Sequence, residues 1–397
     1  MRREMSDHLT TSQAIFAINL FREALKTEES VVCSPLSISI CLAMLFEGAK
    51  DESKIQIKRI FGDDCSDEEI RLFFKNILDV PIEEPVEEKK ISRRQAKRNK
   101  KWRGEKKKDS LLIANRLFID ENAGICIDYQ TIIETNYKGT LENVNFNEKD
   151  RTVNEINAWV TKATDKLITN LVSTSDLLAG CRLILLNATY FHGTWVHEFL
   201  KSKTEPATFH VNERKRKKIE MMSQLKVFYF KEEETFKVLK FAFKSGNCAM
   251  YFFLPHEIVS VSLFLSETDP KVIYNAMNSM AKFAVKVKLP KFEISSTFNV
   301  NESLKHSGIV DIFICGKADL SGISSSDKLF VSTIVQKAVI KVHEEGTEAS
   351  AATLVPCCRL SRSYYRDEPQ EFYADRPFFY FIVDEKSKSI VFAGNYC

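Results

Sequence analysis

The segment at residues 344–353 places the strongest constraint on what this chain can fold into. Its sequence, EEGTEASAAT, has no aromatic or large aliphatic side chain and no proline, and it follows a strand-like run at 331–342. In an extended chain alternate residues point to opposite faces, so Thr347, Ala349 and Ala351 would share one face. Such a segment can enter a sheet between two existing strands without a clash. On the residues alone, a flexible loop or a short helix is the alternative.

Helical patterns dominate the first 80 residues. Thr10 or Thr11 is a suitable N-cap for an amphipathic helix. Its apolar face comprises Ala14, Ile18, Phe21 and Leu25. A second helix is expected after Ser34, a good N-cap, with Pro35 at the first helical position. Because residues 36–46 are apolar nearly all round, this helix should be buried.

Strand patterns dominate the rest of the chain. Residues 111–119 have strand character, and 182–186 is a short apolar run typical of a buried central strand. Apolar and polar residues alternate at 283–289, which predicts a strand with one partly solvated face. Residues 378–383 and 390–392 flank a polar turn and predict a C-terminal hairpin. Early helices combined with many antiparallel strands indicate an α+β fold.

Several function classes find no support in the sequence. The seven His and ten Cys include no HExxH or CxxC, so no metal site is expected, and no nucleotide-binding glycine motif occurs. No nucleophile, base and orienting group form a recognisable catalytic motif. No apolar run approaches the ~18 residues of a membrane span. Residues 1–21 lack the apolar core of a signal peptide, so we expect a cytoplasmic protein or one exported without a signal peptide.

Seven short motifs are spread over about 350 residues of the chain. They are SPLSI at 34–38, NATYF at 187–191 with GTW at 193–195, LPKF at 289–292, ADLSGI at 318–323, KAV at 337–339, EEGTEA at 344–349 and RPF at 376–378. In sequence and in order these motifs resemble those of the serpin family, and the chain is most similar to the inhibitory, leaderless, ovalbumin-like members.

The resemblance implies one serpin domain at 1–397, with a large, mostly antiparallel central sheet, surrounding helices and further small sheets. The segment at 344–376 would carry the hinge and an exposed reactive-centre loop. The expected function is not enzymatic. A serine protease would attack the loop, and the covalent acyl-enzyme would be trapped when the cut loop inserts into the sheet. We expect a monomer. The alternative is a non-inhibitory serpin that binds polyanions or nucleic acid, or acts like a chaperone.

The resemblance assigns three groups of site residues. The hinge comprises Glu344, Gly346, Thr347, Glu348, Ala349, Ser350, Ala351 and Ala352. The shutter, polar groups under the centre of the sheet, comprises Ser34, Ser37, Asn187 and Gln336. The breach, at the top of the insertion site, comprises Trp195 and Lys291, with Glu344 as the expected ion-pair partner of Lys291. Gln336 stands where the family usually has histidine; it keeps a donor and an acceptor for Asn187 but would not confer pH sensitivity.

The scissile bond is placed by counting from the hinge glycine. The family's usual spacing of fourteen residues from Gly346 puts Leu360 before the bond and Ser361 after it, which favours chymotrypsin-like targets. Arg359 and Arg362 flank this position, and the loop is a few residues longer than in most relatives. A small offset would therefore present an arginine to a trypsin-like protease, and this alternative stays open.

A charged insertion at 83–109 is expected to be disordered. Between 89 and 108, twelve Lys/Arg and one acid give a local net charge of +11, against −8 for the rest of the chain. The basic residues are Lys89, Lys90, Arg93, Arg94, Lys97, Arg98, Lys100, Lys101, Arg103, Lys106, Lys107 and Lys108. Three interpretations are open: a solvated linker, a nuclear-localisation signal, or a polyanion site. The polyanion would be a heparin-like glycosaminoglycan, an anionic surface or nucleic acid, with the glycosaminoglycan as the candidate activating cofactor. A smaller basic turn at 214–218 has no assignment.

Overall fold

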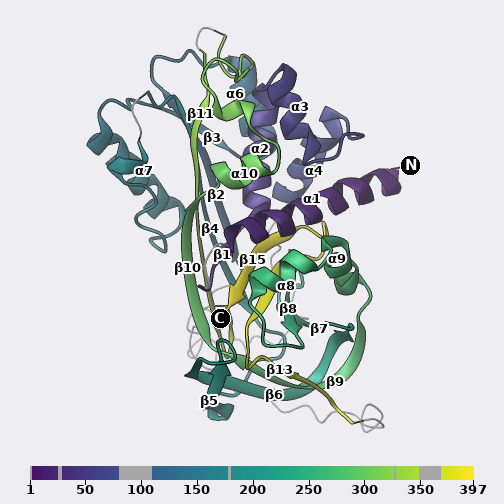
Figure 1. Ribbon diagram of the computed structural model, residues 1–397. Helices are drawn as coiled ribbons and strands as arrows, with labels where there is room; N and C mark the ends of the chain where they lie inside the picture. Colours follow the sequence, from purple (N-terminus) through teal and green to yellow (C-terminus); the bar gives the residue numbers. More distant parts are fainter. Residues whose placement is uncertain (1, 26–28, 80–109, 178–179, 326–327, 348–367) are drawn as a thin grey trace, which may run out of the picture.

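The computed structural model describes residues 2–25, 29–79, 110–177, 180–325, 328–347 and 368–397. Figure 1 shows most helices gathered at one end of a long central sheet, and strands β5, β6, β9 and β13 at the opposite end. The α+β architecture expected from the sequence is confirmed. In the described part of the chain, no helix is long and apolar enough to cross a membrane.

The helices and short 3-10 turns occupy the first half of the chain and three later connections. The helices are α1 (Arg2–Ala24), α2 (Pro35–Gly48), α3 (Asp51–Arg59), α4 (Asp67–Leu78), α6 (Ile127–Tyr137), α7 (Lys149–Ala163), α8 (Val261–Glu267), α9 (Pro270–Asn278) and α10 (Asn301–His306). The 3-10 turns are η1 (Thr174–Asp176), η2 (Lys201–Lys203) and η3 (Asp311–Phe313).

The central sheet has six strands in the order β10-β11-β12-β4-β2-β3. Their bounds are β2 (Ser110–Asp120), β3 (Thr140–Val144), β4 (Leu183–Thr194), β10 (Phe292–Asn299), β11 (Val331–His343) and β12 (Gly346–Thr347). The sheet is mixed: β10 pairs with β11 and β2 with β4 in antiparallel fashion, whereas β11 runs parallel to β4 and β2 parallel to β3. The strands predicted at 111–119 and 331–342 are confirmed.

A second sheet of nine strands carries the C-terminal part of the chain. Eight follow the order β1-β15-β14-β8-β7-β6-β9-β13, and β5 pairs with β6. The strands are β1 (Val32–Cys33), β5 (Thr204–His210), β6 (Arg216–Glu232), β7 (Phe236–Ala242), β8 (Cys248–Pro255), β9 (Ala281–Pro290), β13 (Gln370–Tyr373), β14 (Phe378–Asp384) and β15 (Ile390–Tyr396). The 17-residue β6 joins β5, β7 and β9 into this continuous sheet. The predicted C-terminal hairpin is confirmed as β14 and β15.

The two faces of the central sheet are covered by different helices. Alternate residues of a strand point to opposite faces. On β4, Leu183 and Leu185 therefore share the largest core cluster with α2, whereas Ile184 and Leu186 pack with Ile156 of α7. Every residue of α2 from Pro35 to Phe46 is buried, as its all-round apolar sequence predicts.

The predicted N-cap of the first helix is wrong, whereas the strand predicted at 283–289 is confirmed. Helix α1 begins at Arg2, so Thr10 and Thr11 lie inside it and neither is its N-cap. Once a helix is anchored by its apolar face, adding further residues costs little, so polar residues can extend it. That predicted face, Ala14 to Leu25, is buried in one cluster. In β9, Lys286 and Lys288 are exposed between the buried Val285, Val287 and Leu289, as predicted. Phe283 departs from this pattern, because it is 42% exposed, and its ring packs edge-on against Phe230.

Candidate functional site

Two residues of the hinge, Gly346 and Thr347, already form a strand in the central sheet. In β12, Gly346 pairs with His343 of β11 and with Thr194 of β4. Thr347 pairs with Val342 and Gly193 in the same two strands. The start of the segment singled out in the sequence is therefore seated between β11 and β4.

The conformation at position 346 requires glycine. Its φ is +153°, a value that residues with a Cβ rarely adopt. A Cβ built on this backbone would lie 2.0 Å from the carbonyl oxygen of Gly193 and 2.7 Å from the Cα of Thr194. Gly346 thus allows the chain to turn from β11 into the gap while its backbone passes close to β4.

Thr347 shows how small a side chain this gap accepts. It is fully buried, and it lies opposite Gly193, on the face of the sheet that packs toward α2. Its Oγ1 accepts a hydrogen bond of 2.6 Å from the Gly193 N–H and lies 3.2 Å from the Gly193 carbonyl oxygen, to which it donates. The hydroxyl is thereby satisfied in a site that has no access to water.

The breach residues surround the entry to this gap. The indole of Trp195 is fully buried, stacks on Phe243 with ring centroids 4.6 Å apart, and donates to the His343 carbonyl oxygen at 3.1 Å. The Glu344 carboxylate lies 3.2 Å from the Lys291 ammonium and accepts a hydrogen bond of 2.9 Å from Thr204. The backbone N–H of Trp195 also bonds to the Glu345 carbonyl oxygen at 2.9 Å. Lys291 and Glu344, the predicted ion-pair partners, are therefore in contact.

The charge state of Glu344 is set by opposing effects. Burial disfavours the charged form, but hydrogen bonds from its own backbone, Thr204 and Lys291, together with the Lys291 charge, outweigh burial and lower the pKa of Glu344. The neighbouring Glu345 forms an ion pair with Lys201 at 2.9 Å. Glu344 and Glu345, which precede Gly346, are thus each paired with a lysine from outside β11.

The shutter residues form one buried hydrogen-bond network between α2 and the sheet. The Gln336 amide bridges two elements: its Nε2 donates to Asn187 Oδ1 at 2.9 Å and to the Ser34 carbonyl oxygen at 2.8 Å, and its Oε1 accepts from the Ser34 N–H at 2.9 Å. The Ser37 hydroxyl lies 3.0 Å from Thr189 Oγ1, which in turn donates to Asn187 Oδ1. All five residues are buried.

Ser34 plays a different local role from the one its sequence context predicts. It occupies the N-cap position of α2, as predicted, but its side chain makes no capping bond. Its hydroxyl donates instead to the Val391 carbonyl oxygen at 2.7 Å and lies 3.0 Å from the Ser37 hydroxyl. The network thereby ties the start of α2 to both sheets.

Two members of the network were missed in the sequence. Thr189 joins Ser37 to Asn187, and Asn115 of β2 accepts a hydrogen bond from Asn187 Nδ2. The NATYF motif contained Thr189, but a polar residue in a strand gives no sign of which face it occupies. Asn115 becomes visible only through the pairing of β2 with β4, in which it lies directly opposite Asn187.

Insertion beyond Thr347 would require β11 and β4 to separate. Below β12 these strands pair directly and in parallel, from Val331 opposite Leu183 to Val339 opposite Tyr190. Gln336 and Asn187 face each other within this ladder. The shutter network therefore lies on the line along which the sheet would have to open for such an insertion.

The remaining predicted site residues lie outside the described residues. These are Glu348 to Ala352 of the hinge, Arg359 to Arg362 around the scissile bond, and the basic residues Lys89 to Lys108. Within the described ranges, no cluster of His, Cys, Asp and Glu is suited to hold a metal ion.

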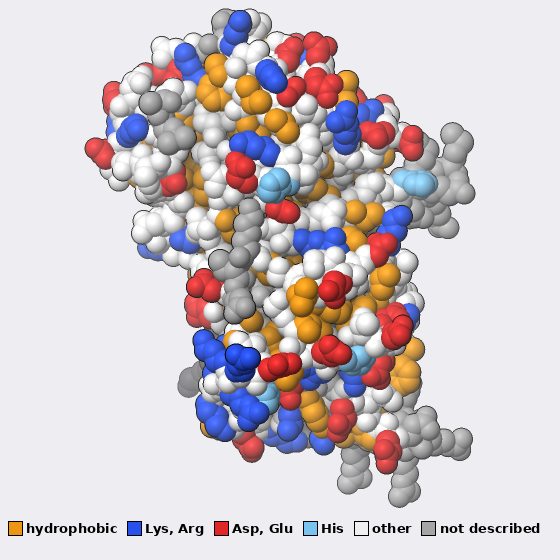
Figure 2. Space-filling view, viewed as in Figure 1, with side chains coloured by type: hydrophobic (Ala, Val, Ile, Leu, Met, Phe, Trp, Pro, Cys, Tyr) orange, Lys and Arg blue, Asp and Glu red, His pale blue; other side chains and the backbone are white. Residues whose placement is uncertain are grey.

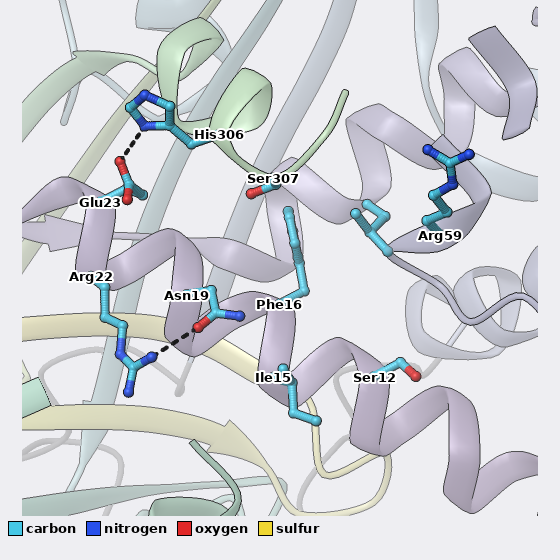
Figure 3. A pocket seen from close by; sticks show the side chains of 10 residues that line it. Ser12, Ile15, Phe16, Asn19, Arg22, Glu23, Arg59, His306 and Ser307 are labelled. Atoms are coloured by element: carbon cyan, nitrogen blue, oxygen red, sulfur yellow. Dashed lines mark hydrogen bonds and ion pairs between the residues drawn. The ribbon is translucent and has the colours of Figure 1, made fainter. Parts of the chain in front are cut away.

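A surface groove near α1 is separate from this site. It is lined from α1 by Phe16, Asn19 and Glu23, together with Arg59 of α3 and His306 of α10. Figure 3 shows Glu23 paired with His306, at 2.8 Å, and the lining groups pointing in different directions. The groove lies among α1, α3 and α10, and none of the hinge, breach or shutter residues lines it (Figure 1).

Comparisons with known proteins agree along nearly the whole chain. The family model described as "Serpin (serine protease inhibitor)" matches residues 11–397. Leukocyte elastase inhibitor A of Rattus norvegicus is 31% identical over 404 residues, covering 98% of this chain and 99% of the relative. Serpin B3 of Homo sapiens is 31% identical over 395 residues and covers 98% of each chain.

Solved structures give the same result. A crystal structure of Serpin48, described as a highly specific serpin of the insect Tenebrio molitor, has a TM-score of 0.82, 27% identity and coverage of 99% of this chain and 98% of that one. Native protease nexin-1 with heparin has a TM-score of 0.80, 28% identity and 98% coverage of both chains.

Proposed function

Because this chain belongs to the serpin family, we propose that it inhibits a serine protease by acting as a suicide substrate. Membership of the family and the relatives named elastase inhibitors support protease inhibition as its role. The observation that carries the mechanism is β12: Gly346 and Thr347 occupy the top of the gap between β4 and β11, and apart from Glu348 only Ala and Ser follow them up to position 352.

The proposed reaction begins as ordinary proteolysis. The protease serine attacks the carbonyl carbon of Leu360, the bond to the nitrogen of Ser361 breaks, and the released amine leaves with a proton. The product is an ester that joins the protease serine to the new C-terminus of the loop. In an ordinary substrate, water would then hydrolyse this ester.

Loop insertion competes with that hydrolysis. The cut frees residues 348–360 to follow Thr347 between β4 and β11, one after another, and to carry the tethered protease along the sheet. Distortion of the protease active site then leaves the ester unhydrolysed. The small residues Thr347, Ala349 and Ala351 share one face of the hinge and favour this inhibitory role over the non-inhibitory alternative, since bulky or charged residues on that face would slow insertion.

A protease panel tests this proposal. Full-length protein mixed with equimolar trypsin-, chymotrypsin- or elastase-like enzyme should give a covalent adduct that survives denaturing electrophoresis with at least one of them. The same protease with its serine replaced by alanine should give none. If every enzyme of the panel cleaved the inhibitor and none formed an adduct, the proposal would be refuted. The mass of the released C-terminal peptide distinguishes cleavage after Leu360 from cleavage after Arg359 or Arg362.

A polyanion cofactor is a second part of the proposal. It is supported by the net charge of +11 at residues 89–108 and by the solved relative that binds heparin. Heparin should then raise the rate of adduct formation, and salt should reduce this effect. A protein lacking residues 83–109 should lose the response. An identical response in both proteins would show that heparin acts at a site outside these residues.

A further inference from the structure

The hairpin of β5 and β6 presents a compact basic surface at the hinge end of the molecule. Residues 201–220 contain seven Lys/Arg and three Glu, in a chain that is net negative outside 89–108. Arg214, Lys215 and Arg216, at the hairpin tip, are exposed. Figure 2 shows a group of basic side chains at lower left, where Figure 1 places β5.

The tip is held in one conformation by its own hydrogen bonds. Asn212 Oδ1 accepts from the backbone N–H of Arg214 at 3.0 Å and of Lys215 at 2.8 Å, and the Val211 N–H bonds to the Lys215 carbonyl oxygen at 2.9 Å. Seven residue pairs of β5 and β6, from Thr204 to His210, support the turn. The basic groups are therefore carried on a preorganised support, which reduces the entropy lost on binding.

The hairpin is attached to both ends of the proposed reactive loop. The N–H of His210 bonds to the Asp375 carbonyl oxygen at 2.7 Å, two residues beyond β13, where the loop rejoins the sheet. Lys201, which precedes β5, forms the ion pair with Glu345 directly before β12. A protease that holds the loop is thus brought to the end of the molecule that carries the basic tip.

The tip cations differ from the neighbouring Lys217. Its ammonium lies 4.5 Å from the Tyr396 ring centroid and donates to the carbonyl oxygen of Cys397, so it serves packing within the fold. Arg214, Lys215 and Arg216 form no ion pair with any other residue that the structure describes. Their charges are therefore available to a partner.

We propose that Arg214, Lys215 and Arg216 form a secondary docking site for an acidic patch on the body of the attacking protease. The inference rests on the proposed inhibitory function and adds a determinant of partner choice outside the loop. A folded protease surface fits this site better than a linear polyanion does, because the patch is short and Glu213 and Glu220 interrupt its positive charge. Complementary charges at such a site mainly raise the association rate.

Anionic and cationic trypsin provide a direct test, since both cleave after Arg and Lys but carry opposite net charges. The variant R214Q/K215Q/R216Q is compared with wild type and with K162Q/K271Q/K317Q, which removes three exposed charges on other parts of the molecule. The measured quantity is the rate of loop attack, counting adduct and cleaved protein together. For anionic trypsin at low salt, we expect the hairpin variant to be about tenfold slower than wild type and the control to change less than twofold.

The other outcomes are equally decisive. Cationic trypsin should attack the hairpin variant as fast as wild type or faster, and ~0.5 M salt should abolish the difference seen with the anionic form. Adduct formation with equal rates for all three proteins would overturn the docking site and leave the inhibitory function standing. Unchanged trypsin rates with reduced retention on heparin would reassign the tip to a polyanion. Absence of any adduct across the protease panel would instead refute the proposed function.

Discussion

At the residue scale, Thr347 is important both for the native structure and for the proposed mechanism. It is fully buried opposite Gly193, and its hydroxyl is paired with the Gly193 backbone. The same contacts would form at the start of insertion. The size and polarity of this side chain should therefore affect both the resting position of β12 and the first step after cleavage.

Thr347→Arg should convert the protein from an inhibitor into a substrate. Placing a guanidinium in this fully buried site costs several kcal/mol, so β12 should leave the sheet and insertion should slow. We expect the yield of adduct to fall at least tenfold while loop cleavage continues. Both are measured on denaturing gels with protease and inhibitor at equal concentrations. Thr347→Ser, which keeps the hydroxyl bonds, is the control. An unchanged yield of adduct in the arginine variant would contradict the mechanism.

At the scale of elements, β11 and β4 are joined at their centre by polar side chains as well as by the parallel ladder. Gln336 contacts Asn187 and Ser34, and thereby links β11 to β4 and to the start of α2. Parallel pairing is slightly weaker per residue than antiparallel pairing. The shutter network should therefore contribute a substantial part of the resistance to premature opening.

Gln336→Met removes this link with little change of volume. It would leave the Ser34 N–H and the Asn187 amide oxygen without this partner in a buried site, at a cost of about 1–3 kcal/mol. We expect a lower midpoint of thermal unfolding and faster spontaneous loss of inhibitory activity on warming. The control is Lys337→Met, the same substitution one residue later, where the lysine bonds to the carbonyl oxygen of Asn170 at the surface. Equal midpoints for the two variants would argue against a latch at Gln336.

Strand and helix assignments were predictable where a residue pattern has one structural meaning. The strand-like run at 331–342 became β11, and the apolar runs at 378–383 and 390–392 became the β14–β15 hairpin. The all-round apolar run after Pro35 became the buried α2. The position of β12 was not predictable. Two residues form a strand only because β11 and β4, about 150 residues apart in sequence, leave a gap at that point.

The candidate site was predictable only in part. The family motifs supplied Ser34, Ser37, Asn187 and Gln336, and the structure brings these into one network. Asn115 carries no motif, and its role depends on the register between β2 and β4. A pairing register is a property of the whole sheet, so no local pattern could have identified this residue.

At the scale of the whole molecule, the proposed mechanism requires a native state that lies above a more stable one. A loop strand inserted along β4 and β11 would replace one parallel ladder with two antiparallel ladders. With about a dozen residues and roughly 0.5–1.5 kcal/mol net per hydrogen bond, the gain is on the order of 10 kcal/mol. That is comparable to the ~5–15 kcal/mol by which an ordinary domain is stable at all.

Cleavage of the loop alone should therefore stabilise the protein against heat. A gain on the order of 10 kcal/mol, divided by the unfolding entropy of a chain of this length, corresponds to a rise of roughly 10 °C or more in the melting temperature. The measurement is calorimetry of intact protein and of protein nicked within 353–362 by a protease that it does not trap. Nicked Thr347→Arg protein is the control, since its insertion should be blocked and its melting temperature should rise much less. If nicking left the wild-type melting temperature unaltered, the native sheet would not be metastable, and β12 would be a fixed part of the fold instead of the start of an inserting strand.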